Sequence, residues 1–426
     1  MMQKTINAAI VGAGHRSLIY GDYALENPDR IRICAVAEPN PDRMRQAAGL
    51  FRLQEQDCYP NADALYASGI PVDLVINGTM DRYHVETTLP ALRAGYNVLL
   101  EKPICATREE LKLLVDEARK SNSRVMVCHV LRYASFYQEI KKRLAAGEIG
   151  RIINVRSEEN ISYHHMAACY VRGRWARRDQ CGSSILLAKC SHDIDLISWY
   201  LSDVAPVYAA SYGGIKTFCP EGAPKGAGTR CLVDCGIEPE CPYSARNNYL
   251  TKNRWTPYVF GDREKQGGLS LEEKIESLKT DNPYGRCVYH CDNNVADHQT
   301  AMFQFEDGTV ATHTLNVSPK ACRTVHIVGT KGEICGTMEN NYFIVRRHCL
   351  ASDCDYTEQR VDISVDAADR HGGGDYNLME DCVNVLSGKE PSISCTDLED
   401  SIHGHLMVFA ADEAMESGAG VAIETI

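Results

Sequence analysis

A lysine stands directly after a short apolar run, between a glutamate and a proline. The run Val98–Leu100 is typical of a buried strand, and Glu101, Lys102 and Pro103 follow it. Open α/β sheets bind ligands beyond the carboxyl ends of their strands. Proline restricts the residue before it, so we expect an extended backbone at Lys102. In a dry cleft such an ammonium group has a lowered pKa, which suits proton transfer. The alternative is a solvated lysine at a strand end.

A histidine and a carboxylate occur at helical spacing in a second stretch. If Ile185–Leu201 forms one helix, His192 and Asp195 share a face with Ala188. Lys189 then lies near the edge of that face. A histidine beside an orienting carboxylate can act as a general acid or base. The alternative is a helix N-terminus with satisfied polar residues.

The first element after the N-terminus has the pattern of a dinucleotide-binding turn. The predicted strand Asn7–Val11 leads into the G-x-G of Gly12 and Gly14, and a helix is predicted over Leu18–Glu26. The first glycine permits a tight turn, and the second lets the backbone approach a pyrophosphate at the helix N-terminus. Ser17 stands in the place of the third glycine.

An acid ends the second predicted strand, Ile31–Ala37. Glu38 lies 26 positions after Gly12. A carboxylate there accepts hydrogen bonds from the adenosine ribose hydroxyls and repels a 2′-phosphate, which favours NAD over NADP. A surface glutamate is the alternative, and Arg16 and Arg43 could bind a 2′-phosphate.

Strands alternate with helices as far as residue 130, which indicates a doubly wound parallel sheet. The further predicted strands are Val72–Ile76, Asn97–Leu100 and Arg124–His129, and the further helices are Asp63–Ala67, His84–Ala94 and Thr107–Ser121. We therefore predict a Rossmann domain over residues 1–130 and a second domain over 131–426.

The second domain has a different pattern, with an irregular insertion at about residues 216–285. We predict strands at Ile152–Ile161, Thr300–Phe305, Val310–Asn316, Arg323–Gly329, Glu333–Thr337 and Tyr342–Arg347, and helices at Phe136–Ala146, Leu271–Leu278, Tyr376–Leu386 and Asp397–Ser417. From Ala296 onward the strands follow one another through short turns, so we expect antiparallel pairing.

Charge and cysteine content limit the possible functions. The 426 residues carry a net charge of −12, which argues against nucleic acid or a membrane surface as a partner. The N-terminus has no pattern of a signal peptide, so we expect a cytoplasmic protein with reduced thiols among its 19 cysteines. Cys231, Cys235 and Cys241 could hold zinc, but without paired spacing or an evident fourth ligand they could equally be free thiols.

Taken together, these motifs resemble the glucose–fructose oxidoreductase / inositol dehydrogenase / MocA (Gfo/Idh/MocA) family. The matching pieces span nearly the whole chain: the glycine turn, Glu38, the segment Asn77–His84, Glu101-Lys102-Pro103, the histidine helix, the hairpin Phe305–Val310 and the turn Gly329–Gly336. The resemblance implies a second domain with an open, mostly antiparallel sheet, which commonly forms the interface of a homo-oligomer, a dimer or a tetramer. The substrate would lie between the nicotinamide and this sheet.

The resemblance also implies roles for single residues. Lys102 would lie beside the nicotinamide and contact the reacting hydroxyl, His192 would be the acid/base, and Asp195 would bind substrate. The residues expected at the cofactor are Gly12, Gly14, His15, Arg16, Glu38, Asn77, Thr79, His84, Glu101 and Lys102.

The chain departs from the family at one position. Many relatives have an aspartate four residues before the histidine, where this chain has Ala188 beside Lys189. The pocket would therefore be more basic and suit a charged or multiply hydroxylated ligand. The residues expected at the substrate are Asp195, Lys189, Arg132, Tyr133, Tyr163, His164, Arg172 and Trp175.

Three functions remain open at this stage. The first is NAD-dependent oxidation of a secondary alcohol in a sugar or sugar derivative, with His192 as base and Lys102 at the alkoxide. The second is glycoside cleavage with tightly held NAD, through transient oxidation at the sugar's 3-position, elimination and rehydration. The third is a non-catalytic binder or regulator, although such a protein would be expected to lose the lysine or the histidine.

Overall fold

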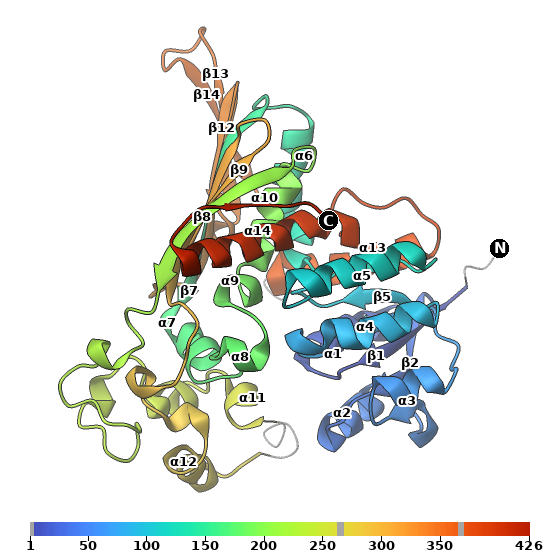
Figure 1. Ribbon diagram of the computed structural model, residues 1–426, viewed down its shortest axis with the longest axis vertical. Helices are drawn as coiled ribbons and strands as arrows, with labels where there is room; N and C mark the ends of the chain where they lie inside the picture. Colours follow the sequence, from blue (N-terminus) through green and yellow to red (C-terminus); the bar gives the residue numbers. More distant parts are fainter. Residues whose placement is uncertain (1–3, 262–267, 365–369) are drawn as a thin grey trace.

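The computed structural model describes residues 4–261, 268–364 and 370–426. In Figure 1 the parallel sheet with its helices (blue) lies on the right, the taller second sheet stands on the left, and the insertion lies below the second sheet. In the described ranges, no helix combines the length and the apolar character that crossing a membrane requires.

The N-terminal sheet is parallel throughout and has the strand order β3-β2-β1-β4-β5-β6. Its elements are β1 (Ile6–Val11), α1 (His15–Glu26), β2 (Ile31–Ala37), α2 (Pro41–Phe51), β3 (Cys58–Tyr59), α3 (Ala62–Ala67), β4 (Leu74–Asn77), α4 (His84–Arg93), β5 (Asn97–Leu100), α5 (Arg108–Lys120) and β6 (Val125–Val127). The order reverses between β1 and β4, which makes the crevice beyond these two strands the expected ligand site. The predicted Rossmann class is confirmed.

The second sheet has nine strands in the order β14-β13-β12-β11-β7-β10-β9-β8-β15. They are β7 (Ile152–Ser162), β8 (Pro206–Gly214), β9 (His298–Phe305), β10 (Val310–Ser318), β11 (Cys322–Gly329), β12 (Gly332–Thr337), β13 (Tyr342–His348), β14 (Tyr356–Asp362) and β15 (Val421–Ala422). All neighbours pair antiparallel except β7 and β10. The predicted open, mostly antiparallel sheet is confirmed, although β8, β14 and β15 were not predicted.

Helices cover one face of the second sheet and also join it to the first. The helices of this half are α6 (Ser135–Ala145), α7 (Tyr163–His165), α8 (Arg178–Cys181), α9 (Ile185–Ala188), α10 (Ser191–Tyr200), α11 (Thr256–Val259), α12 (Leu271–Lys279), α13 (Gly374–Leu386) and α14 (Leu398–Ser417). α10 and α14 pack on the second sheet, whereas α13 packs beside α1 and shares its core. A helix from the far end of the chain thus covers the parallel sheet.

The predicted helix Ile185–Leu201 is wrong in one respect, because it is broken in the middle. α9 begins after Ser184, whose Oγ accepts a hydrogen bond from the Leu187 backbone N–H, and ends at Ala188. α10 starts at Ser191 after two residues outside either helix. Side chains before and after the break therefore do not follow one helical face, and the spacing argument that put Ala188 on the face of His192 and Asp195 fails.

The insertion is irregular, as predicted, and is held by a buried arginine. The guanidinium of Arg172 donates to the carbonyl oxygens of Arg286 (2.7 Å) and Tyr243 (3.0 Å) and to the Tyr249 hydroxyl (3.1 Å). The prediction that Arg172 binds substrate is therefore corrected: its donors tie the insertion to the segment after β7. Short turns of helix dominate the insertion, and α12 is the longest helix in its described part.

Candidate active site

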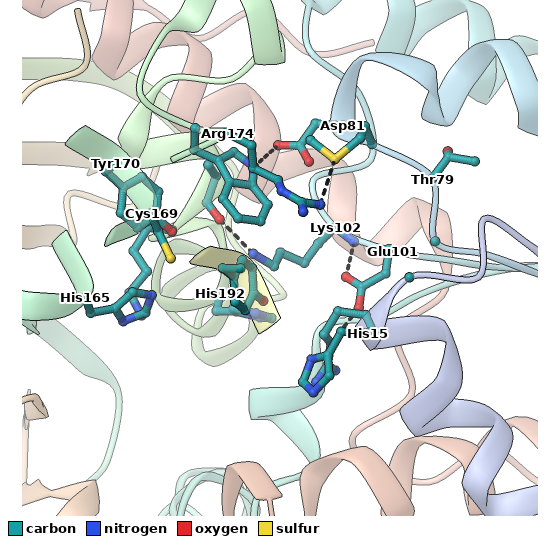
Figure 2. Close-up of a pocket in the computed structure, with 18 of the residues that line it drawn as sticks. His15, Thr79, Asp81, Glu101, Lys102, His165, Cys169, Tyr170, Arg174 and His192 are labelled. Carbon is teal, nitrogen blue, oxygen red and sulfur yellow. Dashed lines mark hydrogen bonds and ion pairs between the residues drawn. The ribbon is translucent and has the colours of Figure 1, made fainter. Parts of the chain in front are cut away.

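A cavity of about 320 Å³ lies beyond the carboxyl edge of the parallel sheet. The glycine turn and the loops after β4 and β5 form one side. The other side comes from the segment around Trp175, the break between α9 and α10, the insertion, β11 and the residues before α13. The side chains that bear on its chemistry are His15, Arg16, Thr79, Asp81, His84, Glu101, Lys102, His165, Tyr170, Arg174, Trp175, Lys189, His192, Trp255, Tyr258, Arg323 and His371. Figure 2 shows Lys102 reaching into this space beside His192.

The glycine turn after β1 lies in close contact with the loop after β4. Gly12 has a φ of +80°, and a Cβ there would lie 2.9 Å from both the Gly78 oxygen and the Thr79 nitrogen. Ser17 fills the place of the third glycine and donates its hydroxyl to the Gly12 carbonyl (2.6 Å). Gly14 caps the N-terminus of α1, where backbone N–H groups and the helix dipole favour an anion.

Lys102 is held between the two halves of the chain. Its Nζ donates to the Ala188 carbonyl oxygen (2.7 Å), and its peptide bond to Pro103 is cis. Burial lowers the pKa of Lys102, and the positive charges of Lys189 and Arg16 act in the same direction against Glu101 and Asp81. A lysine with these surroundings can give or take a proton more readily than a solvated one.

The carboxylate before Lys102 fixes Arg16. Glu101 accepts from Arg16 Nε (2.9 Å) and from the Tyr20 hydroxyl (2.7 Å). Asp375 at the start of α13 accepts from Arg16 Nη2 (2.5 Å), and His371 bonds the other Asp375 oxygen (2.9 Å). With two carboxylates on its guanidinium, Arg16 supports the glycine turn, and its charge is already balanced there.

His192 faces the cavity as a neutral imidazole. Only 9% of its surface is exposed. Burial lowers the pKa of His192 well below 6.5, and the charges of Lys102, His129, Arg323 and His371 lower it further. A buried neutral imidazole next to an ammonium group can accept a proton from a bound hydroxyl.

An ion-pair network supports the cavity from the second sheet. Lys189 Nζ lies 3.3 Å from Glu159 Oε1, and Arg323 Nη2 lies 2.5 Å from Glu159 Oε2. Arg323 Nε also donates to Asp193 Oδ1 (3.0 Å). The predicted basic residue Lys189 thus lines the cavity with its charge balanced by a buried carboxylate.

The structure gives no support to the predicted zinc site. Within the described part of the chain, only Cys190, Asp193 and His313 bring three potential metal ligands within 4.8 Å of one another. Cys231, Cys235 and Cys241 do not form such a group, and Arg323 already supplies the counter-charge to Asp193.

Aromatic side chains form a wall of the cavity, and only one of them, Trp175, was predicted from the sequence. Trp255 and Tyr258 come from the insertion, and Tyr170 and Trp175 come from the segment after β7. Trp175 Nε1 donates to Asp81 Oδ2 (3.2 Å), which fixes the indole. The distance of Tyr170, Trp255 and Tyr258 from Lys102 along the chain explains why no local spacing indicated these three.

Arg174 lies in this wall without a carboxylate. Its guanidinium carbon is 5.8 Å from the Trp175 ring centre and 5.6 Å from that of Tyr258. Among the residues that the structure describes, no acid lies within ion-pair distance of Arg174. Figure 2 shows Arg174 among the side chains that line the cavity with Lys102.

Several predicted substrate residues lie outside the cavity. Arg132 and Asp195 are both 1% exposed and pair with each other, with Nε to Oδ2 at 2.7 Å and Nη2 to Oδ1 at 2.6 Å. The Tyr133 hydroxyl donates to Asp381 (3.0 Å). Tyr163 and His164 accept from Arg254 (3.3 Å) and Trp255 (3.1 Å), respectively. Because their polar groups are satisfied elsewhere, we withdraw these five as substrate contacts.

Three of the predicted cofactor residues support the loops. Asn77 is 1% exposed and donates to the Thr87 hydroxyl (2.8 Å), and His84 bonds the carbonyl oxygens of Pro103 (2.6 Å) and Thr79 (3.1 Å). Glu38 is buried at the end of β2 and accepts the backbone N–H of Ala13 (2.8 Å) and that of Asn40 (2.8 Å). Each carboxylate oxygen of Glu38 keeps a second acceptor position for a ribose hydroxyl.

Family models cover both halves of the chain. The model described as "Oxidoreductase family, NAD-binding Rossmann fold" (GFO_IDH_MocA) matches residues 6–129. The model of the GFO/IDH/MocA C-terminal domain matches residues 137–220.

Individual proteins that this chain resembles are also named as oxidoreductases or dehydrogenases. The oxidoreductase YteT of Bacillus subtilis is 26% identical over 332 residues, which is 75% of this chain and 73% of YteT. Levoglucosan dehydrogenase of Pseudarthrobacter phenanthrenivorans is 25% identical over 54% of this chain and 57% of its own length. An inositol 2-dehydrogenase of Klebsiella pneumoniae is 27% identical over 40% of this chain and 47% of its own. The match thus spans about half the length of these two dehydrogenases.

Solved structures share the whole fold. A levoglucosan dehydrogenase in complex with NADH and L-sorbose has a TM-score of 0.70 at 16% identity, with 99% of this chain and 100% of that chain covered. An NAD binding oxidoreductase from Klebsiella pneumoniae has a TM-score of 0.71 at 13% identity, with the same coverage. With both family models in the expected order and a Rossmann domain followed by an open sheet, this chain belongs to the Gfo/Idh/MocA family of oxidoreductases.

Proposed function

We propose that this protein is an NAD-dependent dehydrogenase that oxidises a secondary alcohol of a sugar or sugar derivative. The observation that supports this most strongly is that Lys102 and His192 line the same cavity beside the glycine turn. The enzyme class follows from the family, and the substrate class and the roles of these residues are our proposal.

The chain offers a fitting site for the dinucleotide. The close approach of Gly12 to Gly78 leaves no room for a Cβ, and the N-terminus of α1 follows at Gly14. We assign the pyrophosphate to this turn and the adenosine ribose to Glu38. When bound, NAD supplies the chemistry by accepting a hydride from the carbinol carbon.

The protein handles the proton. His192, neutral in its buried position, takes the proton of the substrate hydroxyl, and the Lys102 ammonium stabilises the negative charge that develops on the oxygen. The Ala188 carbonyl keeps the ammonium directed into the cavity. The same groups serve the reverse reaction with the proton moving back.

The surroundings of two charged side chains, Glu38 and Arg16, favour NAD over NADP as the cofactor. The Glu38 carboxylate at the end of β2 would repel a 2′-phosphate, and Arg16 is bound by Glu101 and Asp375. Equal affinity for both cofactors in a fluorescence titration would contradict this assignment.

The lining of the cavity favours a sugar that carries an acidic group. The faces of Trp175, Trp255 and Tyr258 suit stacking against the apolar face of a sugar ring. Among the described residues no carboxylate pairs with Arg174, so its fork of N–H donors is suited to a substrate carboxylate. We therefore expect sugar acids to be better substrates than the corresponding neutral sugars.

The open face of the second sheet is proposed as the interface of a homo-oligomer, a dimer or a tetramer. Tyr212 on β8 is 73% exposed and Met302 on β9 is 48% exposed. The register of β8 and β9 places both side chains, with Tyr208, on the face away from α10 and α14. Light scattering after size exclusion would test this, and a monomer at micromolar concentration would contradict it.

A substrate panel tests the function. Purified protein is incubated with NAD+ and neutral compounds (myo-inositol, levoglucosan, D-glucose, D-galactose) or acids (D-glucuronate, D-galacturonate, D-gluconate), and NADH is followed by absorbance. We expect NADH from at least one compound and its loss in Lys102→Ala. Unchanged turnover in Lys102→Ala would contradict the assignment, and glycoside cleavage by retained NAD without NADH release would favour the redox-neutral reaction.

A further inference from the structure

A second buried histidine lies behind His192. His129 follows β6 and is 1% exposed. Its ring centre is 6.0 Å from that of His192, with the two planes at 80°, so one ring presents its edge to the other. His129 does not line the cavity, and the sequence motifs did not single it out.

Three ring nitrogens in this pair have no hydrogen-bond partner. They are Nδ1 of His192 and both nitrogens of His129, and all three are buried. Burying such a group unpaired costs about 1–3 kcal/mol. The nitrogen of His192 that remains for a substrate is therefore Nε2, while Nδ1 points into the protein.

A carboxylate stands on the far side of His129. His129 Nε2 lies 3.6 Å from Asp195 Oδ1, slightly beyond a hydrogen bond. Asp195 is held in place by the two hydrogen bonds from Arg132, whose charge opposes the rise in the pKa of Asp195 that burial causes. The row His192, His129, Asp195 thus runs from the cavity to a buried ion pair.

A third histidine, His405, lies nearby, but both of its ring nitrogens already make hydrogen bonds, so it has no nitrogen left to join this row. His405 lies 5.8 Å from His129, measured between ring centres. Its Nε2 accepts the backbone N–H of Ile104 (2.9 Å), and its Nδ1 bonds the Ser401 carbonyl oxygen (3.1 Å). Equal burial without a free nitrogen makes His405 a matched control.

We propose that His129 is a positioning residue that connects the imidazole of His192 to the carboxylate of Asp195. His129 donates Nε2–H to Asp195 and accepts Nδ1–H of His192 at its own Nδ1, directly or through one water. This arrangement leaves the lone pair of His192 on Nε2, where the substrate hydroxyl gives up its proton. The connection through His129 to Asp195 thus takes the place of a carboxylate at position 188, where this chain has alanine.

The charges around His192 and His129 explain why the protonated form of His192 needs a connection to a buried carboxylate. The groups facing the two histidines are Glu101 and Lys102 from the loop after β5, Arg132 from the turn after β6, Asp195 from α10, Arg323 from β11, His371 before α13 and His405 from α14. Most of these are positive or neutral and disfavour a proton on His192. Asp195, reached through His129, is the acid in this row that stabilises the protonated form.

The inference rests on the proposed role of His192 as the base, so the first measurement needs no substrate. Protein with 15N-labelled histidine is examined by NMR, with the His192 signals assigned through His192→Gln. We expect His192 as the Nδ1–H tautomer in the natural protein and in His405→Gln, and a mixture of tautomers in His129→Phe. If His129→Phe does not fold, His129→Asn gives the same readout.

Kinetics provide the second measurement. We expect kcat to fall about tenfold in His129→Phe, less than the roughly 10²–10⁴-fold contribution of a general acid or base because His192 itself is retained, with the KM for NAD+ unchanged. The acidic limb of kcat moves to lower pH, because the protonated His192 loses its link to Asp195. His192 with its proton on Nε2, or the same tautomer in His129→Phe as in the natural protein, would overturn the proposal. A failure of the dehydrogenase assay alone would count against the proposed function and leave the NMR result decisive for His129.

Discussion

The Nζ of Lys102 donates to the Ala188 carbonyl oxygen over 2.7 Å, and this bond joins the edge of the parallel sheet to the break between α9 and α10. Ala188, where the resemblance to the family led us to expect an acidic side chain, therefore contacts Lys102, the lysine that we propose acts in catalysis, through its backbone. Since a carbonyl oxygen is neutral, the ammonium is held in place without a charged partner on this side, and burial lowers its pKa.

The two glycines of the turn should respond differently to alanine. Gly12→Ala places a Cβ at a φ of +80° and 2.9 Å from the Gly78 oxygen, so the free energy of unfolding should fall by about 1–3 kcal/mol without any cofactor. Gly14→Ala has an ordinary φ and a nearest contact of 3.8 Å, so it should fold normally and lose only NAD affinity. Urea unfolding and titration with NAD+ check both. An unaltered urea midpoint in Gly12→Ala would be evidence against this geometry.

Arg174 should determine the preference for acidic substrates. In Arg174→Gln we expect the KM for a sugar acid to rise about tenfold, the effect of losing one charge-assisted hydrogen bond of about 1.4 kcal/mol. The KM for neutral sugars and for NAD+ should not change. Arg177→Gln is the matched control, because Arg177 lies three residues away and is paired with Asp179 (3.0 Å) and Asp292 (3.4 Å). An equal rise in KM for NAD+ would assign Arg174 to the cofactor instead.

Asp412 on α14 should make stability depend on pH. Burial raises the pKa of Asp412 from 3.8 to about 6 in the folded protein. The folded state thus holds a proton that the unfolded state has lost, and the free energy of unfolding falls by up to about 3 kcal/mol as the pH rises from 4 to 7. Asp412→Asn keeps the size of the side chain and removes this charge. We expect the mutant to be the more stable protein above pH 6, in urea unfolding at several pH values. Parallel pH curves for the two proteins would refute the prediction.

Local sequence patterns identified most of the parallel half. β1, β2 and β5 are largely apolar, with Asn7, Arg32 and Asn97 as the polar exceptions, as expected for strands mostly buried on both faces. β2 and β5 have the predicted bounds. Thr107 caps α5 as its sequence indicates, by accepting from the Glu110 backbone N–H. α2 was not predicted, because the helix is largely polar and its main sequence signal is the capping residue Asn40 in front of it.

The active site was harder to predict, since its residues meet only through tertiary structure. Arg132 and Asp195 are 63 positions apart, and nothing in either segment indicates that their charges pair. The aromatic wall depends on how the insertion folds back, and His371 reaches the cavity from a segment before α13. Lys102 and His192 were identified because each stands in a local motif with a chemical meaning.

Single-turnover hydride transfer tests the central claim most directly. Enzyme in excess is mixed with NAD+ and a substrate from the panel that carries deuterium at the reacting carbinol carbon. The account predicts one deuterated NADH for each ketone formed, and a rate at least about a hundredfold lower in Lys102→Ala while NAD+ still binds. Formation of product without deuterium in the nicotinamide, or an undiminished rate in Lys102→Ala, would contradict it.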